Sequence, residues 1–139
     1  MKTIKKFLLI LTVLLTFNQV HSYAQAMLNY TASQIKQTYT DPEYKLESGT
    51  TDSGTFYMTV TYPKLAQVFY YFDTHFYCNA TVIVPMNSTT RNYLIKTYNA
   101  NYVSTSATTW TAYMDNGVAY ITLKYFDDGG YAFYWTLTD

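Results

Sequence analysis

The sequence predicts an α+β domain in which an antiparallel sheet has helices on one face, arranged as two halves of one helix followed by a β-meander. Three observations support this prediction. Several runs alternate apolar and polar side chains, two segments have helix-capping residues, and short stretches of the first half recur in the second. Consecutive strands interrupted by single helices are typical of antiparallel sheets with helices on one face.

Residues 1–24 are predicted to be a cleavable signal peptide, which leaves a single domain over residues 25–139. Lys2, Lys5 and Lys6 form a basic start, and an almost wholly apolar run follows from Phe7 to Phe17. Small residues come next at Ala24 and Ala26, as at an export cleavage site. The apolar run is too short for a permanent membrane-spanning helix, which needs about 20 residues. We therefore expect an exported protein, periplasmic or extracellular, with no stable membrane anchor. Cleavage after Ala24 and cleavage after Ala26 both fit.

Removal of this segment leaves six basic side chains against nine acidic ones, a net charge of −3. Such a chain, with one arginine, lacks the clustered cations that bind nucleic-acid phosphates or hold a protein on anionic lipid. Cys78 is the single cysteine, which excludes an intrachain disulfide or a thiolate zinc cluster. Its apolar strand pattern predicts that the thiol is buried. We expect no cofactor and no metal.

The first half is predicted to span about residues 31–84. Thr31 and Gln34 fit a capping box that starts a helix, and Ile35 and Tyr39 would share one face of it. The helix is expected to end at Asp41-Pro42, because proline pushes the residue before it out of helical space. Four strand-like runs follow: Tyr44–Ser48, Phe56–Tyr62, Gln67–Asp73 and Phe76–Val84. In the fourth run, one face is expected to hold Cys78, Ala80, Val82 and Val84.

The second half is predicted to span about residues 88–139. Asn87, Ser88 and Thr89 offer helix caps, and an apolar stripe follows at Leu94, Ile95 and Tyr98, which together predict a short helix. Asn116-Gly117 is a strong hairpin signal between two alternating runs. The expected strands are Trp110–Met114, Val118–Tyr125 and Tyr131–Leu137.

Similar stretches in the two halves predict an internal duplication. Tyr57–Tyr62 aligns with Tyr120–Tyr125 at an offset of 63, whereas Val68–Tyr71 matches Ala132–Trp135 one position further on. The aligned inward-facing residues are expected to be Phe56, Met58, Val60 and Tyr62 with Ala119, Ile121, Leu123 and Tyr125. For the matched runs Gln67–Asp73 and Tyr131–Leu137, the choice of buried face is unresolved. The polar ends of the first run favour burial of Val68, Tyr70 and Phe72, whereas the second run favours burial of Phe133, Trp135 and Leu137, which lie at the other parity of the match.

Several further residues support a resemblance to known proteins. They are Tyr70-Tyr71-Phe72, Cys78, Val84-Pro85, Tyr102-Val103, Trp110, Tyr113, Gly129-Gly130-Tyr131 and Phe133-Tyr134-Trp135. With these residues, most of the mature chain resembles a group of small, exported, uncharacterised bacterial proteins, which implies export and the extent of the domain but no activity. The helix-plus-meander repeat is similar in outline to β-lactamase-inhibitor-protein-like and secretion-chaperone-like folds. Function does not follow from that outline.

The polar residues offer no strong catalytic pattern. His75 and Cys78 are three residues apart, so on a regular strand their side chains would point to opposite faces. Asp115, Asp127 and Asp128 lie beside glycine or asparagine and are more typical of turns than of a calcium loop. Glu43 and Glu47 could be paired carboxylates, but both are expected on a solvated face. We therefore expect a protein that is not an enzyme, with an enzyme of unrecognised type as the less favoured alternative.

The excess of tyrosine is the main compositional feature, with 17 tyrosines in the chain. Tyrosine combines rigid apolar area with a polar tip and is favoured at contacts with proteins and sugars, although it is also a good strand residue. The predicted recognition surface consists of Tyr57, Tyr71, Tyr113, Tyr120 and Tyr131. The expected function is an exported interaction module, such as an inhibitor or envelope accessory protein, acting on a protein partner. The alternative is a module that binds a glycan or an apolar small molecule.

Overall fold

The computed structural model describes residues 27–115 and 117–138. Within them the chain forms an eight-stranded antiparallel sheet and two helices, which confirms the mixed α+β class. The predicted signal peptide, residues 1–24, lies outside the described residues. The elements follow in the order α2 (Ala32–Thr38), β1 (Lys45–Thr50), β2 (Phe56–Tyr62), β3 (Ala66–Phe72), β4 (Cys78–Pro85), α3 (Ser88–Asn101), β5 (Val103–Ser106), β6 (Thr109–Met114), β7 (Gly117–Tyr125) and β8 (Tyr131–Leu137).

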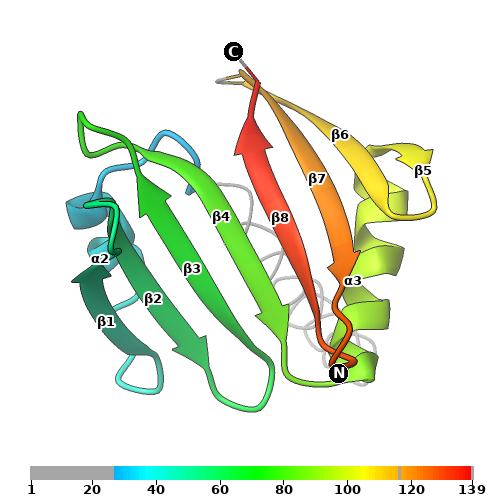
Figure 1. The fold of residues 1–139 in the computed structure, drawn as a ribbon, viewed down its shortest axis with the longest axis horizontal. Helices are drawn as coiled ribbons and strands as arrows, with labels where there is room; N and C mark the ends of the chain where they lie inside the picture. Colours follow the sequence, from blue (N-terminus) through cyan, green and yellow to red (C-terminus); the bar gives the residue numbers. More distant parts are fainter. Residues whose placement is uncertain (1–26, 116, 139) are drawn as a thin grey trace, which may run out of the picture.

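The strands lie in the order β1-β2-β3-β4-β8-β7-β6-β5, so two four-stranded meanders meet at β4 and β8 in the middle of the sheet (Figure 1). By position in this order, β2 corresponds to β6 and β3 to β7. The offset of 63 instead aligns β2 with β7, two strands that hold different places in their halves. The internal duplication therefore stays a prediction.

Both predicted helix starts are present. Thr31 caps α2 in a full capping box: the backbone N–H of Gln34 donates to Thr31 Oγ1 at 3.2 Å, and the Thr31 N–H donates to Gln34 Oε1 at 2.9 Å. Asn87 caps α3, accepting from the Thr90 N–H at 2.9 Å. The second helix runs for 14 residues, longer than expected, and Tyr98 is its buried residue.

The buried face of the sheet, called here the inner face, is built from rows of directly paired side chains. Strand pairing places apolar residues opposite one another from β1 or β2 across to β6 or β7. One row is Leu46, Val60, Val68, Ile83, Phe133 and Leu123, and the next is Met58, Tyr70, Thr81, Trp135, Ile121 and Trp110. All except the half-buried Leu46 are nearly inaccessible to water.

These rows settle which face is buried in β3 and in β8, the two strands whose sequences were matched. Val68 pairs with Val60, and Phe133 pairs with Leu123, so both strands bury the face that each run separately favoured. The sequence alignment had matched Val68 with Ala132 instead. A one-residue slip moves every side chain of a strand to the opposite face, which accounts for the apparent conflict.

Cys78 is buried as predicted, but two other predictions about the core are wrong. Tyr125, expected inside, is 56% exposed at the end of β7. Cys78 does not share a face with Ala80, because the β3–β4 register shifts between Tyr71 and Phe72. Tyr71 pairs with Ala80 and Phe72 pairs with Cys78, leaving one extra residue in β4, as in a β-bulge. The bulge turns Cys78 to the inner face, whereas Ala80, Val82 and Val84 lie on the other face.

Rings from both helices contact the inner face. Tyr39, the C-cap of α2, has its hydroxyl oxygen 2.7 Å from that of Tyr70, and the Tyr62 hydroxyl donates to Tyr39. In α3 the ring of Tyr98 packs edge-on against Trp135, with ring centroids 5.4 Å apart. Trp135 Nε1 also donates to the Tyr98 hydroxyl at 3.3 Å. Burial raises the pKa of Tyr62, Tyr70 and Tyr98 well above the ordinary tyrosine value of 10.0.

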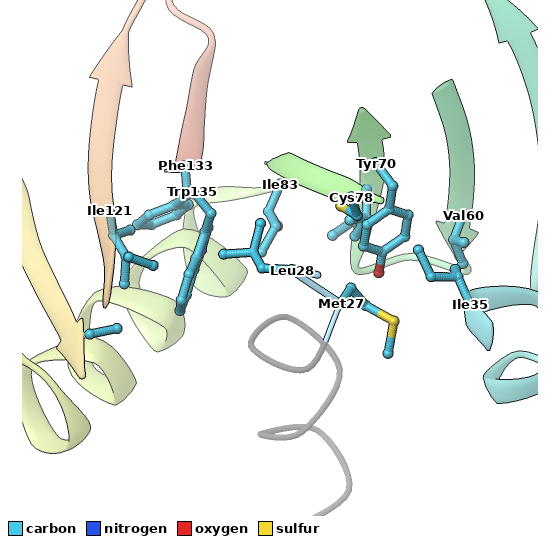
Figure 2. Packing of buried hydrophobic residues seen from close by; sticks show 14 of the residues in the cluster. Met27, Leu28, Ile35, Val60, Tyr70, Cys78, Ile83, Ile121, Phe133 and Trp135 are labelled. Carbon is cyan, nitrogen blue, oxygen red and sulfur yellow. The ribbon is translucent and has the colours of Figure 1, made fainter. Parts of the chain in front are cut away.

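The first described residues belong to the core that joins the halves. Met27 and Leu28 are 2% and 0% exposed and lie among side chains of both meanders (Figure 2). The next residues extend the sheet beside the start of β4: the Asn29 N–H donates to the Cys78 carbonyl at 2.7 Å, and the Cys78 N–H donates to the Tyr30 carbonyl at 2.8 Å. This segment therefore extends the sheet beside β4 and packs into the common core.

Candidate functional site: the outer face of the sheet

The face opposite the buried rows, called here the outer face, has one row of paired residues that crosses every strand of the sheet. Three of the predicted recognition residues, Tyr57, Tyr71 and Tyr120, belong to this row. In sheet order it is Gly49, Tyr57, Tyr71, Ala80, Thr136, Tyr120, Thr111 and Val103. Strand pairing thus brings together tyrosines from both halves of the chain.

Tyr57 and Tyr71 form a ring pair on adjacent strands, with centroids 6.1 Å apart and planes tilted by 41°. The Tyr57 ring lies over Gly49, where an added Cβ would come within 2.8 Å of the Tyr57 hydroxyl oxygen. Both tyrosines are half-buried. Partial burial, together with the neighbouring Tyr134 and Tyr57 hydroxyls, raises the pKa of Tyr71. This pair therefore stabilises the sheet as well as contributing surface.

Tyr113 and Tyr120 are the most open part of the face. They are 74% and 54% exposed, from β6 and β7. Tyr113 lies two residues from Thr111, which pairs with Tyr120, so both tyrosines project from the same side of the sheet. Because exposed rings have less packing to lose than buried ones, these two are the best candidates for a purely recognition role.

Small side chains separate the two tyrosine groups. Ala80 of β4 and Thr136 of β8 pair with each other between Tyr71 and Tyr120. Three strand spacings separate the backbones of Tyr71 and Tyr120, which amounts to about 14 Å. Within this row, small side chains therefore separate Tyr71 from Tyr120, whereas Tyr134 of β8 brings a ring to the same part of the face in the adjacent row.

The two paired rows of the outer face hold a single charged side chain. The adjacent paired row is Glu47, Thr59, Phe69, Val82, Tyr134, Thr122 and Thr109. Glu47 is the one charged side chain in the two rows, and its carboxylate lies 2.9 Å from Lys45 Nζ. The Lys124 ammonium lies over the Tyr134 ring, 4.5 Å from its centroid. Tyr134 was missed as a surface residue, although its alternation with the buried Phe133 and Trp135 could have revealed it.

Tyr131, the fifth predicted recognition residue, lies on the other side of the sheet. It has the same parity along β8 as Phe133, and it pairs with Tyr125. Its ring instead contacts the helix layer, where the Arg91 guanidinium of α3 lies 4.7 Å from the ring centroid. It cannot share a contact surface with the other four tyrosines.

The candidate catalytic groups stay apart. His75 is exposed in the β3–β4 turn, where Asp73 Oδ1 accepts its backbone N–H at 2.9 Å. Cys78 is fully buried, and burial raises the pKa of its thiol to about 11. Among the described residues, no three His, Cys, Asp or Glu side chains gather as metal ligands would.

The acidic residues occupy solvent-exposed positions. Glu43 and Glu47 are both exposed, and Glu47 pairs with Lys45. Asp128 accepts the Gly130 backbone N–H at 2.8 Å within the β7–β8 turn, as a turn-forming aspartate does. Asp115 and Asp127 are also exposed. No pair of these carboxylates is placed in the buried setting that acid–base catalysis favours.

No family model, curated protein or solved structure matches this chain. The resemblance to exported bacterial proteins, and the outline similarity to inhibitor-like and chaperone-like folds, therefore stay predictions. In the portion of the chain that the structure describes, no helix is long and apolar enough to cross a membrane.

Proposed function

We propose that the protein is an exported, non-enzymatic binding module whose recognition surface is the outer face of the sheet. In this proposal both helices cover the inner face and leave the outer face open to a partner. The partner is a protein in the envelope or outside the cell, and the module serves as an inhibitor or accessory factor.

One observation supports this proposal most strongly: the outer face holds the tyrosine row, which includes the exposed Tyr120, and the neighbouring exposed Tyr113 projects from the same side. Large exposed aromatics cost solubility and contribute nothing to the core, whereas tyrosine is among the residues that contribute most to protein–protein affinity. The near absence of charge on the two central rows favours an uncharged or apolar partner surface over an acidic or basic one.

A glycan is the second candidate, and the composition of the face favours it. The two rows combine tyrosine rings with the accessible threonines Thr109, Thr122 and Thr136. Sugars stack on aromatic rings through their C–H faces and exchange hydrogen bonds with hydroxyl groups.

The test is the double variant Tyr113→Ala with Tyr120→Ala. Because both rings are exposed, the melting temperature should change little, whereas capture of the native partner from envelope extract should fall at least tenfold. A tenfold loss corresponds to about 1.4 kcal/mol, a modest value for two interface tyrosines. Quantitative mass spectrometry of the captured proteins, alongside thermal unfolding, provides both measurements.

The matched control is Tyr93→Ala with Tyr125→Ala, which removes two exposed tyrosines from α3 and from the inner-face side of β7. The control should retain capture. Equal capture by both double variants would exclude the outer face as the recognition surface. Affinity electrophoresis of the same variants in gels containing soluble polysaccharides separates the glycan candidate, because only a glycan-binding face would retard the wild-type protein.

A further inference from the structure

The centre of the outer face is unusually apolar for a sheet surface that meets water. Antiparallel sheets with one solvated face normally carry polar or charged side chains on that face. Here Phe69, Val82 and Tyr134 lie side by side on β3, β4 and β8, and Val84 follows Val82 on the same side of β4. All four are half-buried within their strands. This composition is more typical of a sheet face that packs against another surface.

The outer face is also large enough for a stable interface between proteins. Its eight strands, about 4.8 Å apart, span about 34 Å, and a seven-residue strand such as β3 or β8 is about 23 Å long. These dimensions outline roughly 800 Å². Protein interfaces of standard size remove about 800 Å² from each partner. One contact over this face would therefore reach the size that a stable dimer needs.

The charge distribution favours a second copy of the chain as the partner. A copy brings the same charges to the interface, so a face of one sign would repel itself. The two paired rows avoid this repulsion, because Glu47 is their one charged side chain and its carboxylate lies 2.9 Å from Lys45 Nζ. Identical sheets also have the same twist, which lets them pack face to face with strand directions about 30° apart.

The order of the strands lets two copies be complementary in shape. A two-fold axis parallel to the strands and between β4 and β8 would place β4 of each copy over β8 of the other. Val82 pairs with Tyr134, and Ala80 pairs with Thr136. At the centre of the dimer, Val82 would therefore lie opposite Tyr134 of the second copy, and Ala80 opposite Thr136. A ring then meets a smaller side chain in the first pair, and two small side chains allow close approach in the second.

We infer that the outer face binds the outer face of a second copy, forming a symmetric dimer in which the two sheets lie face to face. This inference rests on the proposed function, in which the outer face is open and recognises a protein, and it names one such protein as the chain itself. Tyr71 of β3 and Tyr120 of β7 would meet across the interface, which places the tyrosine row inside the dimer.

The test uses the full chain, expressed for export and recovered in soluble form. Sedimentation velocity should show a dimer at micromolar concentrations that dissociates on dilution. Thr136→Arg places a cation beside its own copy at the centre of the interface and should weaken the dimer at least about 100-fold, because like charges across an interface repel. Ala80→Arg, on the neighbouring strand, should act in the same way.

The matched control is Ser33→Arg, which adds the same charge at an exposed position of α2 and should leave the dimer intact. Circular dichroism should show the wild-type fold in each variant. A wild-type protein that stays monomeric, a dimer that both sheet variants leave intact, or equal dissociation by Ser33→Arg would overturn the inference. A monomeric wild type whose Tyr113→Ala with Tyr120→Ala variant still loses capture would overturn the dimer alone, and the proposed binding of another protein would stand.

Discussion

Cys78 shows how one extra residue changes the chemistry of a side chain. The β-bulge turns its thiol to the inner face, where it lies 3.5 Å from the Thr81 hydroxyl and has no exposed surface. Burial favours the neutral thiol over the thiolate and raises the pKa to about 11. Since the thiolate is the nucleophile, this cysteine is chemically silent in the folded protein.

We predict that the Cys78 thiol reacts with iodoacetamide at pH 8 only when the protein unfolds. Raising the pKa from 9.0 to about 11 lowers the thiolate fraction roughly 100-fold, and burial blocks access as well. Mass spectrometry should show little modification in buffer and rapid modification in urea. Comparable rates in the two solvents would mean that the thiol is reachable in the native state.

Among the elements, α2 depends most on the cap at its N-terminal end for its stability, because a helix of seven residues has few internal hydrogen bonds. Thr31→Ala removes the oxygen that accepts the Gln34 N–H and should destabilise the protein by about 1 kcal/mol. Urea unfolding measures the change. Ser33→Ala, at an exposed position in the same helix, is the control and should cost nothing. Equal effects of the two substitutions would contradict the capping role.

The strands illustrate what periodicity can and cannot predict. Alternation located β2, β7 and most of the other strands because each buries one face. It missed β5, whose residues Val103–Ser106 are all exposed and form an edge of the sheet, since a strand without a buried face leaves no pattern. It also placed Ala80, Val82 and Val84 on the same face as Cys78, because a bulge interrupts the period of two without a sequence marker.

At the scale of the whole molecule, the candidate surface depends on pairings far apart in the sequence. The offset of 63 aligns Tyr57 with Tyr120, which predicts that both lie opposite the core. The outer row includes both. Tyr131 was added by composition alone, and its contact with Arg91 of α3 could not be seen without the helix in place. The sequence therefore suggested candidate rings, whereas which of them share a face required the strand register and the position of α3.

The two halves share one consequence of burying tyrosine. Tyr62 and Tyr70 in the first half and Tyr98 and Tyr102 in the second have pKa values raised by burial well above the ordinary 10.0. In the folded state these hydroxyls keep their protons above pH 10, whereas the unfolded chain releases them. Because the unfolded state then binds fewer protons, the free energy of unfolding falls as pH rises.

We therefore predict a stability that is insensitive to these groups below about pH 9 and falls above about pH 10, by up to about 5 kcal/mol per pH unit when all four tyrosines stay protonated in the native state. Urea unfolding at a series of alkaline pH values measures this slope, and tyrosinate absorbance should rise with unfolding. Tyr62→Phe removes one of the four groups and should reduce the slope by about a quarter. A slope unchanged by Tyr62→Phe, or tyrosinate absorbance that reaches its full unfolded value while the protein stays folded, would show that water reaches these hydroxyls in the native structure.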